Sequence, residues 1–258
     1  MDALRELWRF MTTEDNWWGG NGITQRLTDH VWISVVSVVI AALLALPPAM
    51  ALGHIRRGGL IAATVVNIGR SIPTFAIVSL LFPISLSLGF TENLGFWPTT
   101  VALVLLAIPP MFTNAYTGIV GVEAPVVDAS RGMGLRPAEV LWGVELPNAL
   151  PLVITGVRVA AVQVVATATL GAYVGFGGLG AFINEGFSQN DDGKLLTGAV
   201  LVALLAIGVE LGFGVVERVL TPWARTTSPR GRWSRWQRAD IIPEYELVES
   251  PASERTDA

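Results

Sequence analysis

The sequence lacks cysteine, and this absence excludes disulfides, thiolate zinc sites and cysteine nucleophiles. Histidine is scarce: His30 and His54 are the only two, and they do not have the spacing of a zinc-protease pair. A G-x-x-x-x-G-K-[ST] sequence is also absent, so the chain carries no phosphate-binding loop of its own. The sequence therefore predicts no catalytic site and no metal site, and an enzyme is not expected.

Charged residues make up only 15% of the 258 residues, whereas about a quarter of the residues in a soluble domain are charged. Hydrophobic residues reach 52%. Several uncharged runs are about 18 residues or longer, which is the length at which an apolar run predicts a transmembrane helix. The composition therefore predicts an all-α integral membrane protein.

Five apolar runs predict five transmembrane helices, at about residues 31–53, 60–88, 97–121, 150–173 and 195–219. The second apolar region, residues 58–88, would be about 46 Å long as one helix, whereas a hydrocarbon core is about 30 Å thick. We therefore expect a break near Pro73, because proline lacks the N–H that continues a helix. Together these helices form a predicted transmembrane domain over residues 29–221.

The two ends of the chain differ from this domain. Residues 1–28 carry four large aromatic side chains among polar residues, and such side chains suit the level of the lipid headgroups. An interfacial helix is preferred here over a disordered leader, and no cleavable signal peptide is expected because the first strongly apolar run begins only at Val31. Residues 222–258 are basic and then acidic without apolar periodicity, which predicts a disordered tail.

Lysine and arginine predict the orientation, because cytoplasmic loops carry an excess of them. One set of alternating loops holds Arg56 and Arg57, then Arg131 and Arg136, then the arginines after the last helix. The other set holds only Arg26 and Lys194 close to membrane ends. The first set is therefore predicted to be cytoplasmic. The N-terminus would lie outside, and the C-terminal tail and the loop at residues 123–149 would lie in the cytosol.

That loop, called the coupling loop below, carries a spaced pattern. It reads Asp128-Ala-Ser130, three residues, Gly134, nine residues, and then Val144-Glu-Leu-Pro147. The pattern resembles the EAA loop of ATP-binding-cassette (ABC) importer permeases, which is Glu-Ala-Ala, three residues, Gly, nine residues, and Ile-x-Leu-Pro. The three departures, at Asp128, Ser130 and Val144, are mild. A helix of small residues can pack closely into a groove of a partner, and glycine permits a sharp turn after it.

The resemblance assigns contact with a cytosolic ATPase to part of the coupling loop. The predicted coupling residues are Asp128, Ala129, Ser130, Arg131, Gly132, Gly134, Glu145, Leu146 and Pro147.

Other segments extend the resemblance over roughly residues 25–215, to the permeases of glycine betaine, carnitine and choline importers. They are Arg70-Ser-Ile-Pro-Thr74, Asn114-Ala-Tyr-Thr-Gly-Ile119, Arg131-Gly-Met-Gly134, Val144-Glu-Leu-Pro-Asn-Ala-Leu-Pro151, Gly156-Val-Arg158 and Gly177-Gly-Leu-Gly180. The resemblance implies a type I ABC importer transmembrane domain with a five-span, methionine-permease-like core and a cytoplasmic coupling helix, in a bacterial-type inner membrane. It implies as partners an ATPase dimer, a second permease subunit, an extracytoplasmic solute-binding protein and the lipid bilayer, and no nucleic acid. ATP and Mg²⁺ would be bound by the ATPase, and no cofactor by this chain.

Seven residues from the family-like segments are candidates for the translocation path or its gate: Arg70, Pro73, Asn114, Tyr116, Gly177, Gly178 and Gly180. Arg158 and Glu210 lie inside predicted spans, where a charge facing lipid costs about 2.5–3.5 kcal/mol. They line a pathway, or Glu210 pairs with an arginine, and the second interpretation is preferred. The G-x-G-x-x-G match at residues 175–180 has no strand before it, so it predicts a helix end or hinge and not a dinucleotide site.

Three alternatives stay open. Permeases of methionine or other amino-acid importers share the coupling pattern and the five-span plan. An ATP-independent secondary transporter would show inverted repeats with ionisable residues at the membrane midplane, and no convincing repeat is found. A membrane scaffold would leave the spaced loop unexplained. Glycine betaine, choline, carnitine and proline are not distinguished as cargo, and no aromatic cage for a quaternary ammonium is identified.

Overall fold

Helices form nearly all of the computed structural model, which describes residues 2–56, 64, 73–90 and 95–225. The chain divides into two units, Met1–Thr221 and Pro222–Ala258, and the fold described below is that of the first. In chain order the helices are α1 (Asp2–Thr12), η1 (Glu14–Asn16), α2 (Ile23–Ile55), α4 (Thr74–Ser87), α5 (Phe96–Val120), α6 (Ala124–Gly132), α7 (Pro137–Val140), η2 (Leu141–Glu145), α8 (Leu146–Thr167), η3 (Ala168–Val174), α9 (Leu179–Gln189), α10 (Asp192–Leu220) and η4 (Pro222–Arg225).

Four of the described helical stretches are long and apolar enough to cross a membrane: α2, α5, the continuous stretch Pro137–Val174 and α10. The apolar helix α4 has 14 residues, so it is about 21 Å long. It begins at Thr74 directly after Pro73, where we expected a break. Residues 60–63 and 65–72 of the predicted second span lie outside the described residues.

The membrane helices extend beyond the predicted spans at the ends that carry polar residues. Helix α2 begins at Ile23, eight residues before the predicted start, so the predicted boundary after residue 28 falls inside a helix. Its first turns are polar, yet their side chains are paired: Gln25 donates to Asp29, and Arg26 donates to Glu185. The helix also continues through Pro47 and Pro48. Because these polar side chains are paired, keeping them in the helix costs little. The sequence pattern treats them as unpaired and therefore predicts a later start for α2.

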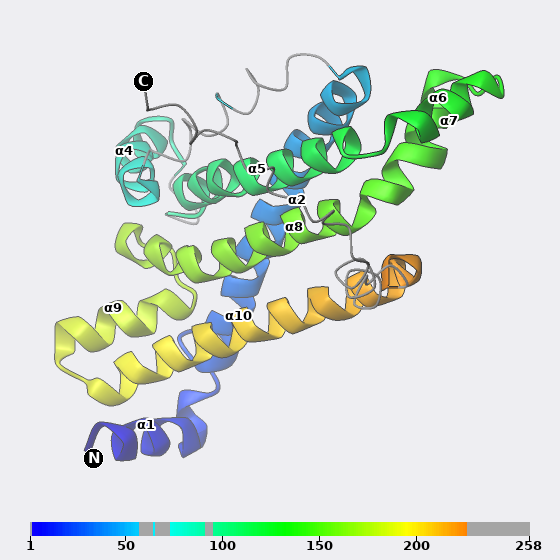
Figure 1. Ribbon diagram of the computed structural model, residues 1–258. Coiled ribbons are helices and arrows are strands. Elements are labelled where there is room, and N and C mark those ends of the chain that lie inside the picture. The colour runs from blue at the N-terminus through cyan, green and yellow to red at the C-terminus, as the bar shows by residue number, and fades with distance from the viewer. Residues whose placement is uncertain (1, 57–63, 65–72, 91–94, 226–258) are drawn as a thin grey trace, which may run out of the picture. The chain divides into compact units, whose positions relative to one another are not determined.

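Helix α5 packs against both α2 and α8, α8 in turn contacts α10, and α2 runs across these helices (Figure 1). Alanines spaced one turn apart on α2 are buried in the core with the apolar side chains of α5. Glycines allow close approach: a Cβ on Gly53 would lie 2.8 Å from Ile119, and one on Gly156 would lie 2.8 Å from Asn114. Small residues let membrane helices approach closely, and here they bring α2 and α8 against α5.

Two small-residue pairs in the sequence, Gly171-x-x-x-Gly175 and Gly208-x-x-x-Gly212, have the spacing that favours close packing of membrane helices, and they behave differently. A Cβ on Gly171 would lie 2.9 Å from Thr99, so η3 approaches α5 closely there. Gly208 and Gly212 have no described atom within 4 Å of such a Cβ. The face of α10 that they belong to also exposes large apolar side chains such as Leu204 and Leu211. Within the described part of the chain nothing covers this face, so it is available to lipid or another subunit.

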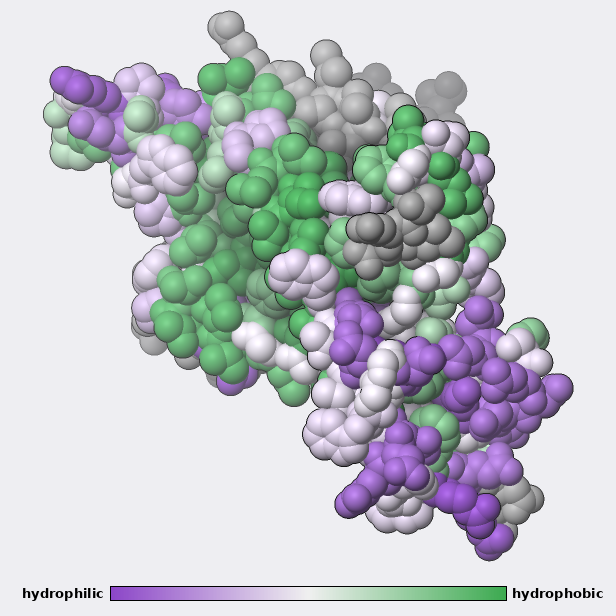
Figure 2. Space-filling model, turned by 180° about the vertical axis from the view of Figure 1, so that it is seen from behind, coloured by the Kyte–Doolittle hydropathy of each residue, from purple (hydrophilic) through white to green (hydrophobic). Residues whose placement is uncertain are grey.

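Hydrophobic and hydrophilic residues are separated on the surface. In Figure 2, hydrophobic residues gather over the middle of the first unit, and hydrophilic residues gather towards its two ends. Helices α6 and α7 lie at one end, and α1 lies at the other (Figure 1). Helix α1 packs against α10, and Phe10 makes an edge contact with Phe182 of α9 at 5.9 Å, whereas Leu4 and Trp8 are exposed. The placement of residues 1–28 at the membrane surface stays a prediction.

Candidate functional site

The coupling loop folds as a compact helical hairpin. Helix α6 ends at Gly132, and Gly134 has φ +87°, a left-handed conformation that glycine adopts without strain. Pro137 then starts α7, where the N–H that proline lacks would have no partner in any case. Val122, Val127 and Val140 form a small buried cluster with Leu135 packed against it. The hairpin therefore has its own apolar core and one defined outer face.

That outer face contains most of the predicted coupling residues. Asp128, Ala129, Arg131, Gly132 and Gly134 are all exposed. Two large apolar side chains are exposed beside them, Met133 at 74% and Trp142 at 60%. A mixture of apolar and charged groups on a rigid hairpin is suited to docking on another protein.

Ser130 and Glu145 differ from the other predicted coupling residues, because both are buried within the chain. The Ser130 hydroxyl donates to the Val126 carbonyl at 2.8 Å. Glu145 is 0% exposed, and its Oε2 lies 2.6 Å from Nδ1 of His54 on α2. Glu145 therefore joins the coupling loop to α2 within this chain, and its role in coupling to an ATPase stays a prediction. Leu146 and Pro147 are half-buried and form the first turn of α8.

The predicted translocation residues do not form one cluster in the described chain. Arg70 lies outside the described residues. Pro73 precedes α4, and Asn114 and Tyr116 lie on α5, where Asn114 Nδ2 donates to the Pro110 carbonyl and Tyr116 stacks on Phe112. The apolar groove between α2, α8 and α10, lined by valines such as Val35 and Val39, includes neither of them. Their place along a path stays a prediction.

Gly177 and Gly178 connect η3 to α9, and Gly180 lies in the first turn of α9. A Cβ on Gly180 would lie 2.3 Å from the Thr169 carbonyl oxygen, and one on Gly178 would lie 3.2 Å from Nδ1 of His30. The same Nδ1 accepts a hydrogen bond from the Leu179 N–H at 3.3 Å, and His30 Nε2 donates to the Val165 carbonyl at 2.9 Å. Buried His30 therefore ties α2 to both α8 and α9.

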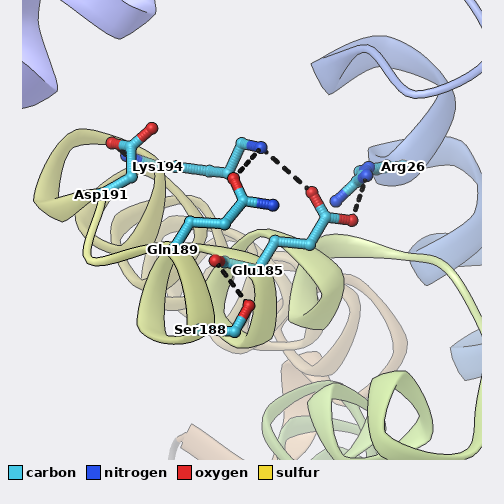
Figure 3. A network of polar contacts seen from close by, with 6 residues as sticks. All are labelled: Arg26, Glu185, Ser188, Gln189, Asp191 and Lys194. Carbon is cyan, nitrogen blue, oxygen red and sulfur yellow. Dashed lines mark hydrogen bonds and ion pairs between the residues drawn. The ribbon is translucent and has the colours of Figure 1, made fainter.

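A polar network that the sequence did not reveal joins α2, α9 and α10 at the end opposite the coupling loop (Figure 3). Arg26 is only 6% exposed; it donates to Glu185 at 2.6 Å and lies 4.3 Å above the ring of Phe182. Lys194 donates to the other oxygen of Glu185 at 3.2 Å. Glu185 is 159 residues from Arg26 and 9 residues from Lys194 in sequence, so no local spacing predicts the whole network.

The pKa of Glu185 reflects this network. Partial burial acts to raise the pKa, but the hydrogen bonds and positive charges of Arg26 and Lys194 outweigh it and hold the pKa of Glu185 below its ordinary value. The carboxylate therefore stays ionised near neutral pH and keeps the three helices joined.

Arg158 of α8 forms ion pairs with two carboxylates of α10. It contacts Glu210, and its Nη1 lies 3.3 Å from Oε2 of Glu217. The interpretation in which Glu210 pairs with an arginine is confirmed. No group of three or more His, Asp or Glu side chains suited to a metal ion occurs within residues 2–56, 64, 73–90 and 95–225.

Known structures identify the fold. Inward-facing conformations of the MetNI methionine ABC transporter superpose with a TM-score of 0.65 at 24% identity, covering 77% of this chain and 96% of that one. An amino acid ABC transporter crystallised with histidines gives a TM-score of 0.59 at 16% identity, covering 78% and 92%. The fold is that of a type I ABC importer transmembrane subunit.

The family follows from sequence. The chain belongs to the binding-protein-dependent transport system inner membrane components, whose family model matches residues 37–222. It is 34% identical to the choline transport system permease protein OpuBB of Bacillus subtilis, over 79% of this chain and 90% of that protein. It is 32% identical to the carnitine transport permease protein OpuCB of Listeria monocytogenes, over 80% and 91%. The chain is therefore a membrane transport subunit and not an enzyme.

Proposed function

We propose that this chain is the permease subunit of an ATP-driven importer for a compatible solute such as glycine betaine, choline, carnitine or proline. The observation that carries the proposal is the outer face of the coupling loop: Asp128, Ala129 and Arg131 are exposed together beside the left-handed turn at Gly134. Relatives named for choline and for carnitine transport, each at least 32% identical, support the solute class.

The proposed assembly contains more than this chain. Two cytosolic ATPase subunits bind ATP and Mg²⁺, a second permease subunit completes the path, and an extracytoplasmic binding protein delivers the solute. The coupling loop lies in the cytosol and docks on an ATPase subunit through its outer face. The N-terminus lies outside and the C-terminal tail inside, as the arginine distribution indicates.

The proposed mechanism is alternating access. Closure of the ATPase dimer on ATP moves the coupling loops, and the permease helices then turn as rigid bodies to open the path outwards. The coupling loop is suited to this task because its valine cluster and its short helices make it rigid. This chain binds no nucleotide in the cycle.

Two measurements test the function. The chain, expressed with its proposed partner subunits, should copurify with a stoichiometric ATPase, and uptake of labelled solute should need both ATP and the binding protein. Competition should then rank the solutes, with choline, carnitine or glycine betaine as inhibitors. A chain that transports alone without an ATPase would refute the proposal.

A methionine or other amino-acid importer is the second candidate, since the MetNI transporter shares this fold. Inhibition by methionine alone in the same competition assay would establish that candidate and exclude the compatible solutes.

A further inference from the structure

The C-terminal end of α2 is attached to both ends of the coupling loop. His54 Nδ1 lies 2.6 Å from Glu145 Oε2 where the loop joins α8. Two residues further on, Arg56 adopts a left-handed conformation with φ 50°, and its Nη2 donates to the Val122 carbonyl at 2.8 Å where the loop begins. Two polar contacts, one from the last turn of α2 and one from the residue that follows it, therefore hold the two ends of the coupling loop.

Glu145 faces His54 because the helix has an extra residue in the turn before it. Residues Leu141–Glu145 form a π-helix, in which the Leu146 N–H donates to the Leu141 carbonyl. The extra residue rotates the following backbone relative to a regular α-helix, so that Trp142 stays exposed while Glu145 is fully buried. Short π-helical turns of this kind often occur at functional sites.

Stability alone does not account for this pair. Glu145 is a completely buried carboxylate, and its Oε1 has no hydrogen-bond partner in the described chain. A buried ion pair with an unsatisfied oxygen is often no more stable than an apolar replacement of similar volume. The side chains are placed where they link the coupling loop to α2, and this position favours a role in transmission.

Helix α2 reaches from this contact to the opposite end of the unit. It has 33 residues, so it is about 50 Å long. Near its N-terminus, Arg26 pairs with Glu185 of α9, and His30 accepts from the Leu179 N–H at the start of α9. One continuous helix therefore connects the coupling loop with the connection that contains Gly178.

We propose that His54 is a positioning residue that fastens Glu145 to α2, so that the base of the coupling loop and the C-terminal end of α2 move as one body. This inference rests on the proposed importer function. Movement imposed on the loop by the ATPase then reaches α9 through α2.

Substitutions test the link in the whole complex reconstituted in liposomes. His54→Ala should lower uptake at least tenfold while the copurified ATPase and its basal ATP hydrolysis remain. His54→Asn places an amide nitrogen near the position of Nδ1 and should recover much of the uptake. The double variant His54→Ala/Glu145→Gln should be no worse than the more impaired single variant, since both remove one interaction.

Asn148→Ala is the matched control. Its side chain is exposed one turn from Glu145 and bonds only to the Val144 carbonyl among its described contacts, at 2.7 Å. It should transport like the parent. Additive effects of the two substitutions in the double variant, or a loss of copurified ATPase that accounts for the lost uptake, would overturn the proposal.

A crosslink tests the same link within a single variant, because the joined and the unjoined complexes carry the same substitutions. Because the chain lacks cysteine, His54→Cys/Glu145→Cys can be joined by a short bis-methanethiosulfonate reagent without side reactions in this chain. If the two residues move as one body, the joined complex should recover uptake that the unjoined double variant has lost. A crosslink that forms but blocks uptake refutes the link, whereas absence of uptake in the parent complex would refute the importer function itself.

Discussion

Two glycines in the family-like motifs are needed for different physical reasons. Gly134 has φ +87° and open space around it, so a side chain there would strain the backbone without meeting a neighbour. Gly180 has an ordinary φ, but a Cβ would lie 2.3 Å from the Thr169 carbonyl oxygen. A sequence pattern shows only that glycine occurs at both positions, and the structure separates a turn from a packing contact.

Gly134→Ala should impair coupling more than folding. The left-handed conformation costs a non-glycine residue roughly 1–2 kcal/mol, so the turn between α6 and α7 would shift and displace the outer face of the loop. Uptake and solute-stimulated ATPase activity should fall, and membrane insertion should not. Gly143→Ala is the control, because it lies in the same loop without being a predicted coupling residue, has open space for a Cβ and lacks a positive φ. Equal effects of the two substitutions would contradict this explanation.

Gly180→Ala should instead destabilise the subunit. The added methyl group would overlap backbone atoms, and overpacking of this kind costs about 1–3 kcal/mol. The midpoint of thermal unfolding in detergent should fall. Gly177→Ala should leave it unchanged, since the nearest atom to its Cβ would be the Asp29 carboxylate at 3.7 Å. If both variants unfold at the parent temperature, the close packing of α9 on η3 is not needed.

At the scale of the elements, the sequence could not match the polar pairs that join distant helices. The apolar runs place α5 within one residue and α10 within three residues of their observed ends, because length and hydropathy suffice for an isolated membrane helix. The start of α2 is missed because Arg26 counts as a charge until its pairing with distant Glu185 is known. Similarly, the motif identifies Glu145, but only the π-helical turn shows that its side chain is directed inwards.

The network of Glu185 should make stability depend on pH. Its folded-state pKa lies below the ordinary value of 4.5, so the ion pairs favour the folded state above that pH. The contribution is lost as the pH falls through the lower folded-state value. Glu185→Gln should therefore lower the unfolding temperature at pH 7, and the difference from the parent should shrink in acid. Glu14→Gln, an exposed carboxylate on η1, should show no such difference at either pH.

Arg158 should matter more than either of its carboxylate partners alone. Arg158→Gln leaves Glu210 and Glu217 without their guanidinium, and an unpaired charge within a membrane is costly. Glu217→Gln keeps the pair between Arg158 and Glu210. The yield of folded protein should therefore fall clearly for the first variant and slightly for the second. Replacing Arg158, Glu210 and Glu217 together by neutral residues should restore part of the yield of folded protein. If the yield does not recover, the ion pairs have a role beyond compensating one another's charge.

For the whole molecule, the predicted orientation depends on the distribution of arginines, of which the structure describes only some. The predicted cytoplasmic set includes Arg56 and Arg131, and Arg56 contacts the base of the coupling loop directly. Arg26, in the opposite set, is almost completely buried in an ion pair. Because Arg26 is paired inside the fold, it does not count as a free charge of a loop. Without Arg26, the excess of lysine and arginine in the predicted cytoplasmic set of loops is larger. The orientation itself, with the coupling loop in the cytosol, stays a prediction.

Labelling can test this orientation directly, because the chain has no cysteine and single cysteines can be introduced against no background. Asp15→Cys lies in exposed η1 near the N-terminus, and Met133→Cys lies on the outer face of the coupling loop. In intact cells a membrane-impermeant maleimide should label position 15 only, and position 133 should react after permeabilisation. The opposite pattern would place the coupling loop outside, away from any cytosolic ATPase, and would remove the physical basis for coupling through it.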